Sequence, residues 1–351
     1  MGPPGPDATA DRPAERALPR RLLAMLAGGP AARGRAVLAC KTVCAVAAVL
    51  LLLSAQPLVL RLLGATGTAF LMQCVGAASG NARSRYQHWC MVACGTAMSG
   101  LMGLALILRG HPLAQDALLV ALSGAVFAVR RRLPDHATFP LFLFTTTLLT
   151  AAMGERSLTV PPVACCLPLV ALAISYPMYF LVLPRLEVPI PGPAVSARTP
   201  YRAALAALLA VAVQHFVDLP RAYWSVLVAV LITAETHQDL LNRAGDRLIM
   251  TVVGSVTGLL LHFASRDIFA LQLAILLISI FGATFYRAAS NRLMVGFLSV
   301  YVVFLFAIIG QWDVDLVVVR VYETAIGCAI ALLVPLVLPY DAAPPAPRPD
   351  A

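Results

Sequence analysis

Long apolar runs separated by short polar connections make up most of the chain between residues 35 and 340. Most runs cover about 17–23 residues, the length that an α-helix needs to cross the hydrocarbon core of a bilayer. The pattern predicts twelve membrane helices, six in each half of the chain. The predicted helices are residues 37–55, 58–79, 88–108, 113–129, 138–154 and 160–183, then 201–217, 221–236, 246–264, 268–285, 293–310 and 317–338.

Seven positions of the first half recur in the second half at one constant offset of 158 residues (258 − 100 = 158). A fixed offset of this kind indicates an internal duplication. The pairs are Arg85 and Arg243, Gly100 and Gly258, Gly124 and Gly282, Phe127 and Phe285, Phe139 and Phe297, Glu155 and Asp313, and Pro177 and Pro335. Six helices is an even number, so both copies would enter the bilayer from the same side. The sequence therefore predicts an all-α polytopic protein built from two parallel six-helix repeats.

The composition agrees with an integral membrane protein. The chain has 351 residues, of which 60% are hydrophobic and 12% are charged. A soluble protein carries roughly 25% charged residues. This chain does not have enough polar surface to fold as a soluble protein.

The polar segments divide the chain into five parts. Residues 1–34 are rich in Pro, Ala, Gly and Arg and are predicted to be a disordered cytoplasmic tail. The repeats are assigned to residues 35–183 and 201–338, with the second resembling the family named below. A proline-rich cytoplasmic linker, residues 184–200, joins them, and residues 339–351 form a second disordered cytoplasmic tail.

The arginines of the connections predict the orientation of the chain, because positive charge gathers on the cytoplasmic side. If the N-terminus is cytoplasmic, twelve arginines lie on that side and six on the other, with both termini inside. The cytoplasmic set is Arg83, Arg85, Arg130, Arg131, Arg132, Arg185, Arg198, Arg202, Arg243, Arg247, Arg287 and Arg292; the opposite set is Arg61, Arg109, Arg156, Arg221, Arg266 and Arg320. This spread explains the net charge of +9 without a nucleic-acid partner.

Several classes of chemistry are not expected. Lys41 is the only lysine and follows a cysteine, so the chain has no Gly-Lys-Ser/Thr phosphate-binding motif. The eight cysteines lie in apolar runs, and no cluster of His or Asp lies beside them as zinc ligation would require, which indicates small core residues rather than metal ligands. His111 and Asp116 match an H-x4-D pattern, but no acceptor or phosphate signature accompanies them. We expect no enzyme activity, no cofactor and no metal.

Small residues predict where helices pack closely. Gly95, Ser99 and Gly103 lie four residues apart on one helix face, and so do Gly254 and Gly258. In lipid, close backbone approach supplies the packing that hydrophobicity cannot.

Ionisable residues inside predicted helices are candidates for function, because a charge at the bilayer centre costs about 2.5–3.5 kcal/mol. Lys41 and Arg202 occupy matching places in the first helix of each half. They either extend to the headgroups or form a pair of cations at a cytoplasmic vestibule. Glu323 lies three residues after Arg320 on the same helix face. The two form an ion pair, or Glu323 titrates during transport.

A second group of charges lies at the predicted inner end of the eighth helix. Glu235, His237 and Asp239 face Arg243 and Arg247 across a short turn. The alternatives are a solvated loop network and a proton-entry or gating cluster.

The second half resembles the fusaric acid resistance (FUSC) family and its aromatic acid exporter relatives. The resemblance is carried by Tyr223-Trp224-Ser-Val-Leu, by Arg202, Arg243 and Arg247, by the glycine-rich helix, and by Arg320 with Gly327, Ala331 and Pro335. It implies a bacterial inner-membrane efflux protein for aromatic carboxylates or related compounds, which works with a periplasmic membrane fusion protein. The chain departs from the family at Ala234-Glu235, where a Gln-Pro is common.

Three functions follow as hypotheses. The first is secondary efflux of small organic anions, driven by the proton gradient, with substrate bound between the halves near the midplane. The others are a passive organic-anion channel and a non-transporting membrane scaffold. The candidate substrate and coupling residues are Lys41, Arg202, Glu235, Arg243, Arg247, Arg320 and Glu323. The expected partners are the lipid bilayer, the anion, a periplasmic fusion protein and a second copy of the chain.

Overall fold

The computed structural model describes most of the chain. The described residues are 30–77, 84–108, 110–132, 162–182, 195–217, 223–287, 289–310 and 314–341. All regular elements within these ranges are helices, as predicted. The predicted helix 138–154 and most of both tails and of the linker lie outside the described residues.

The first half contributes four long helices and a shorter helix flanked by two turns. They are α2 (Pro30–Leu52), α3 (Leu58–Ala77), α4 (Ser84–Ile107), α5 (Pro112–Arg132), the 3₁₀ turn η3 (Pro162–Cys166), α7 (Leu167–Pro177) and the π turn η4 (Met178–Val182). A proline inside a helix removes a backbone donor and disturbs the regular ladder. Pro177 therefore accounts for the change from α to π geometry at the end of α7.

The second half contributes six helices. They are α8 (Thr199–Phe216), α9 (Tyr223–Leu231), α10 (His237–Ser265), α11 (Phe269–Tyr286), α12 (Asn291–Ile308) and α13 (Val314–Val337). Thr236 caps α10 by accepting a hydrogen bond from the Asp239 amide at 3.2 Å. Hydroxyl caps of this type satisfy one of the free amides at a helix start.

Seven helices within the described ranges are long and apolar enough to cross a membrane, so the protein is multi-pass. They are Ala32–Leu52, Pro112–Arg132, Pro162–Phe180, His237–Ser265, Phe269–Tyr286, Asn291–Ile308 and Val317–Val337. Each coincides with one of the twelve predicted segments. Of the others, 58–79 and 88–108 contain the shorter apolar helices Leu58–Gln73 and Met91–Ile107. Within the described residues, the predicted helix 221–236 contains α9, which has nine helical residues.

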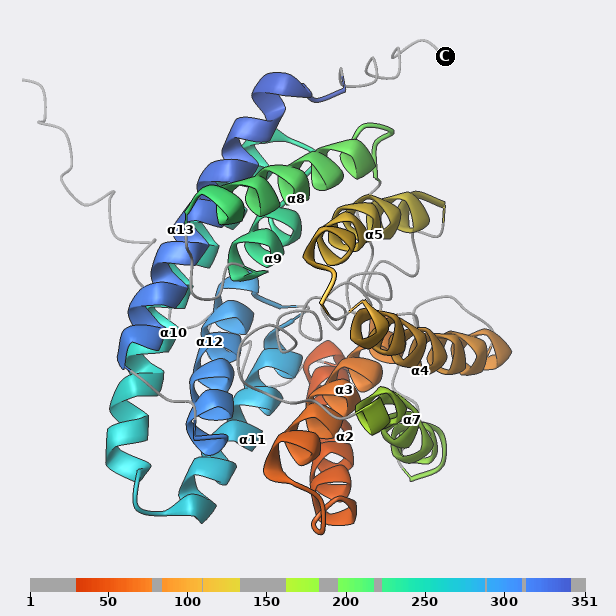
Figure 1. Ribbon diagram of the computed structural model, residues 1–351. Helices are drawn as coiled ribbons and strands as arrows, with labels where there is room; N and C mark the ends of the chain where they lie inside the picture. The colour runs from red at the N-terminus through yellow and green to blue at the C-terminus, as the bar shows by residue number, and fades with distance from the viewer. Residues whose placement is uncertain are drawn as a thin grey trace, which may run out of the picture.

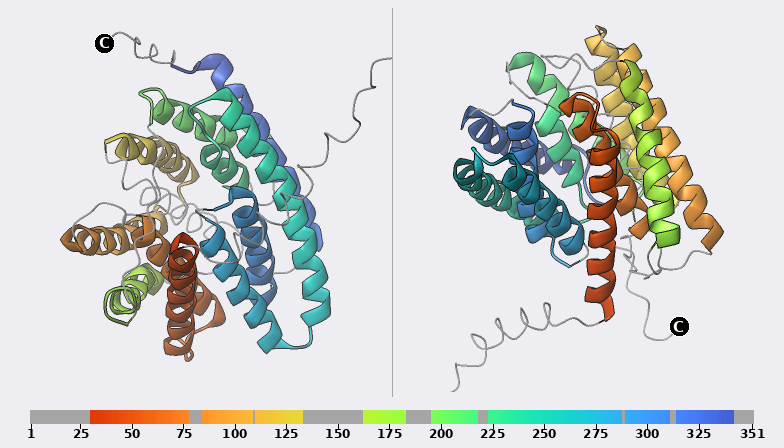
Figure 2. Two further views of the ribbon diagram at one scale, coloured as in Figure 1. Left: turned by 180° about the vertical axis from the view of Figure 1, so that it is seen from behind. Right: turned by 90° about the horizontal axis from the view of Figure 1, so that it is seen from below.

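The helices form two groups that meet along two contacts (Figure 1). In the first half, α3 and α7 pack against α2 and α4. In the second half, α13 packs against α8, α9 and α10, while α12 lies between α10 and α11. The groups meet where α5 packs on α8 and where α2 packs on α11. Figure 2, right, shows α2 between the two groups.

Helices at corresponding places in the two halves make corresponding contacts. With the offset of 158 residues, α2, α3, α4, α5 and α7 correspond to α8, α9, α10, α11 and α13. The contacts α2–α3, α3–α7, α4–α7 and α2–α7 recur as α8–α9, α9–α13, α10–α13 and α8–α13. The same correspondence relates the two contacts between the groups: α5 corresponds to α11 and α8 to α2, so the α5–α8 contact has its counterpart in the α2–α11 contact.

The predicted small-residue faces pack as expected. A Cβ added to Gly254 would lie 2.5 Å from the Gly296 carbonyl oxygen of α12, and one added to Gly258 would lie 2.9 Å from Val303. In the first half, a Cβ added to Gly95 would lie 2.9 Å from Leu172 of α7. Close helix approach through small residues therefore holds both groups together.

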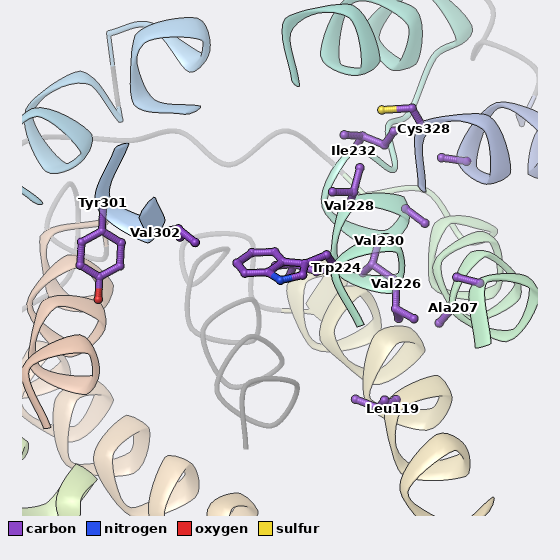
Figure 3. Close-up of a cluster of buried hydrophobic side chains, with 14 of the residues drawn as sticks. Leu119, Ala207, Trp224, Val226, Val228, Val230, Ile232, Tyr301, Val302 and Cys328 are labelled. Atoms are coloured by element: carbon purple, nitrogen blue, oxygen red, sulfur yellow. The ribbon is translucent and has the colours of Figure 1, made fainter. Parts of the chain in front are cut away.

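The core of the second half surrounds α9. Seven consecutive residues of this helix, 224–230, are buried. Figure 3 shows Val226, Val228 and Val230 together on α9, with the Trp224 ring extending away from them. Across the two groups, Thr66 of α3 and Tyr301 of α12 share a hydrogen bond of 2.5 Å. Gln73 also donates to Thr284 at 3.1 Å.

Candidate functional site

Three charged side chains are buried between α9, α10 and α13. Arg247 of α10 is 6% exposed, Arg320 of α13 is 4% exposed, and Glu323 of α13 is fully buried. The Arg320 guanidinium lies over the indole of Trp224, with its Cζ 4.4 Å from the ring centroid. We call Arg247, Arg320, Glu323 and Trp224 the deep cluster.

Gly327 explains why α13 can bring these side chains against α9. A Cβ at this position would lie 2.6 Å from the Ser225 carbonyl oxygen, so only glycine permits this approach of the two backbones. Residues three, four and seven positions apart share one face of a helix. Arg320 and Glu323 therefore lie on the face of α13 that Gly327 presents to α9.

The deep cluster carries a surplus of positive charge. Arg247 and Glu323 both lie close enough to Arg320 to act on its charge, the first by repulsion and the second by attraction. Two guanidinium groups and one carboxylate give a formal charge of +1 in a buried place. Nε of Arg247, and Nε and Nη1 of Arg320, have no hydrogen-bond partner among the described residues. Such an arrangement attracts an anion that can accept hydrogen bonds.

Cys328 lies beside the deep cluster. It interacts with Arg247, and its Sγ donates to the Ala244 carbonyl at 3.7 Å. The thiol is 6% exposed and is not part of a disulfide.

A second group, which we call the end cluster, lies where α8 begins and α9 and α13 end. It consists of Arg202, Glu235, Thr199, Ser196 and Tyr340. Arg202 is 1% exposed and lies 3.6 Å from the Glu235 carboxylate. Thr199 Oγ1 accepts from Arg202 at 2.8 Å and donates to Glu235 at 2.8 Å, and the Ser196 amide donates to Glu235 at 3.0 Å.

Tyr340, just beyond α13, closes the end cluster. The Arg202 guanidinium lies over the Tyr340 ring at 4.5 Å. Burial raises the pKa of the Tyr340 phenol, and the positive charge of Arg202 opposes that rise. Nε and Nη1 of Arg202 have no hydrogen-bond partner within the described part of the chain.

Arg243 connects the two clusters along α10. It donates to the Thr233 carbonyl at 3.2 Å and lies one turn before Arg247. Arg130, at the end of α5, interacts with Arg243 and Glu235. His237 and Asp239 are exposed at the same end. Of the charges expected around this turn, Glu235 and Arg243 lie near Arg130, whereas His237 and Asp239 are exposed and Arg247 belongs to the deep cluster.

Lys41 lies apart from both clusters. It is 2% exposed, donates to the Tyr179 carbonyl at 3.1 Å, and lies 4.8 Å from the Tyr179 ring centroid. Because α2 begins at Pro30, Lys41 lies near the middle of that helix rather than in its first turn. Lys41 and Arg202 thus each contact a tyrosine of their own half, and neither contacts the other's partner.

Sequence analysis did not single out four members of these clusters, Ser196, Thr199, Trp224 and Tyr340, or the neighbouring Arg130. Trp224 entered only through the family resemblance, Tyr340 was assigned to a tail, and Arg130 was counted only as a loop arginine. Contacts such as Arg202–Tyr340 join residues far apart in the chain, and helix periodicity does not reveal them. Within the described ranges, no group of three His, Cys, Asp or Glu residues is placed to hold a metal.

Comparison with known proteins bears on the same segment. Residues 205–334 match the family described as fusaric acid resistance protein-like, and this range contains the deep cluster. No curated protein and no solved structure matches the chain. The resemblance based on Tyr223, Trp224, Arg243 and Arg247 is therefore confirmed: residues 205–334 are a fusaric acid resistance-like (FUSC) segment of a multi-pass helical membrane protein.

Proposed function

We propose that this protein is an inner-membrane secondary transporter that exports small organic anions, aromatic ones among them, and that its transport is coupled to protons. The family match indicates membrane transport or efflux. The observation that carries the finer proposal is the deep cluster, in which two buried arginines and a tryptophan lie beside a buried carboxylate.

The charge balance of the deep cluster favours an anionic substrate. A buried cation without a counter-ion is costly, and the cluster holds one more cation than anion. A monovalent anion removes this surplus and can accept from the Arg247 and Arg320 nitrogens that have no described partner. The Trp224 ring offers an apolar face to an aromatic body at the same point.

Glu323 is the proposed coupling residue. It lies one turn from Arg320 and is fully buried, so its charge strongly affects the arginines beside it. Protonation of Glu323 increases the positive surplus, and loss of the proton decreases it. Protonation of Glu323 therefore raises the affinity of the cluster for an anion, and a bound anion in turn favours protonation of Glu323, so the anion and the proton are expected to bind and move together.

The topology proposed from the sequence is two parallel six-helix repeats with both termini in the cytoplasm. The exchange of helix contacts under the offset of 158 residues supports the duplication. The excess of loop arginines on one side supports the orientation. In this topology α10 begins and α13 ends on the cytoplasmic side, so the end cluster lies at the cytoplasmic entrance.

Inside-out membrane vesicles can test the coupling with radiolabelled benzenesulfonate, an aromatic anion that stays charged and crosses lipid slowly. The vesicle lumen is made alkaline, so that the proton gradient drives protons and the anion into the lumen together, and valinomycin with potassium holds the membrane potential at zero. We expect the native protein to accumulate the anion against its gradient, and Glu323→Gln to abolish accumulation. Asp267→Asn is the matched control, because Asp267 is an exposed carboxylate whose side chain is 86% accessible.

A passive organic-anion channel is the second candidate, favoured by the positive surplus of the deep cluster. In that case the native protein equilibrates benzenesulfonate without accumulating it, and Glu323→Gln keeps downhill flux. Absence of any flux above that of empty vesicles would refute both candidates and leave a scaffold.

A further inference from the structure

We propose that the anion pathway lies within the second half of the chain, along α10 and α13, and that the first half has no equivalent pathway. This inference rests on the proposed function, and it specifies where in the fold the anion passes.

A series of arginines runs from the end cluster into the deep cluster. Arg202 and Arg243 lie at the end where α10 begins, and Arg247 is one turn further along α10, a rise of about 6 Å. Cys328 contacts Ala244, one residue after Arg243, and Arg320 lies eight residues before Cys328, about 12 Å along α13. The series thus covers about 14 Å of a hydrocarbon core of about 30 Å.

Three members of the series offer donors to a passing anion. Arg202, Arg247 and Arg320 are each less than 7% exposed, and each has at least one nitrogen without a hydrogen-bond partner among the described residues. Successive sites of moderate affinity allow an ion to enter and also to leave.

The first half lacks these side chains at the corresponding positions. The offset of 158 residues places Trp89 at Arg247, Pro162 at Arg320 and Cys165 at Glu323. Trp89 is 72% exposed, so it does not face the interior at all. Among the described residues of the first half, Lys41 is the only charged side chain that is buried, whereas the second half buries four.

The described contact between the halves includes neutral hydrogen bonds and partly exposed arginines, among them Arg35, whose guanidinium lies over the Phe285 ring. Thr66 with Tyr301 and Gln73 with Thr284 join the two groups in the described part of this contact, and Arg287 donates to the Gln73 carbonyl at 3.2 Å. His215 and Asp116 pair at 2.9 Å at the opposite end of α8 from the end cluster. The buried positive charge thus lies inside the second half, and we place the anion there rather than between the halves.

Cys328 provides a natural reporter for this pathway. The native protein in inside-out vesicles is treated with the anionic thiol reagent MTSES or the cationic reagent MTSET, and labelling is quantified by peptide mass spectrometry. Cys94 is the control in the same molecule, because it is fully buried in the core of the first half. We expect MTSES to label Cys328 at least tenfold faster than MTSET does, and benzenesulfonate to slow that labelling.

Arg247→Gln tests whether the reagent follows the arginine series. We expect the preference of Cys328 for MTSES to disappear in this variant, while Cys94 stays unlabelled. The pathway is refuted if Cys328 resists MTSES in a protein that transports benzenesulfonate, or if Cys94 reacts as quickly. If MTSES labels Cys328 selectively but no flux occurs, the pathway stands and the proposed transport is refuted.

Discussion

The close contact between α10 and α12 allows a quantitative prediction at Gly254. Replacement by alanine would place a Cβ 2.5 Å from the Gly296 carbonyl oxygen and 2.7 Å from the Ser299 Cβ. A carbon–oxygen contact needs roughly 3.3 Å, so the two helices must separate by about 0.8 Å. The obstacle is backbone, which cannot rotate away as a side-chain tip would.

Such overpacking costs about 1–3 kcal/mol. Alanine gains up to about 1 kcal/mol of helix propensity in water, but less in lipid, where the unfolded segment is still helical. We therefore expect Gly254→Ala to lower the thermal midpoint of the detergent-solubilised protein by about 2–6 °C. Intrinsic fluorescence can follow the transition, because the chain has three tryptophans.

Gly245 is the matched control on the same helix. A Cβ there meets nothing within 4 Å, so Gly245→Ala should leave the midpoint unchanged or raise it. Equal midpoints for Gly254→Ala and Gly245→Ala would refute the conclusion that the glycine face of α10 sets its distance from α12.

Three further predictions concern the contact between the halves and the two clusters. Thr66→Val leaves the buried Tyr301 hydroxyl without its Thr66 partner and should lower the free energy of unfolding by about 1–3 kcal/mol, measured by thermal unfolding. Thr42→Val is the control and should have little effect, because the Thr42 hydroxyl donates only to a carbonyl of its own helix. Trp224→Ala should raise the benzenesulfonate concentration for half-maximal flux about 2–30-fold, and Trp224→Phe should raise it less; equal values for both variants would contradict the aromatic contact. The pKa of Tyr340 is raised in the folded protein, so on a rise in pH the unfolded phenol loses its proton first. The thermal midpoint should therefore fall as pH rises above about 10. In Tyr340→Phe the midpoint should fall less steeply over the same pH range.

The sequence predicts the helical class well, because each membrane helix must satisfy its own backbone and bury its own apolar length. This is why seven predicted segments coincide with membrane-length helices. It predicts α9 poorly. Residues 222–234 are mainly apolar, but hydropathy alone does not give the length of the helix that forms within them.

The sequence identified the charged residues of the candidate site but not which of them lie together in the fold. Arg320 and Glu323 share a face by their spacing alone, and helix geometry is enough to pair them. The approach of Arg247 to Arg320 depends on how α10 packs on α13, and the position of Trp224 depends on Gly327. Lys41 shows most clearly that sequence patterns do not reveal tertiary contacts. Its position matches that of Arg202 in the sequence, but this match does not predict the Tyr179 carbonyl to which Lys41 donates.

The shortness of α9 has a consequence for how the protein is made. The nine-residue helix is about 14 Å long, which is about half of a hydrocarbon core of about 30 Å. Its main neighbour is α13, which is synthesised after it. The final packing of α9 therefore requires α13, and a protein shortened before α13 would leave the buried residues of α9 without their main neighbour.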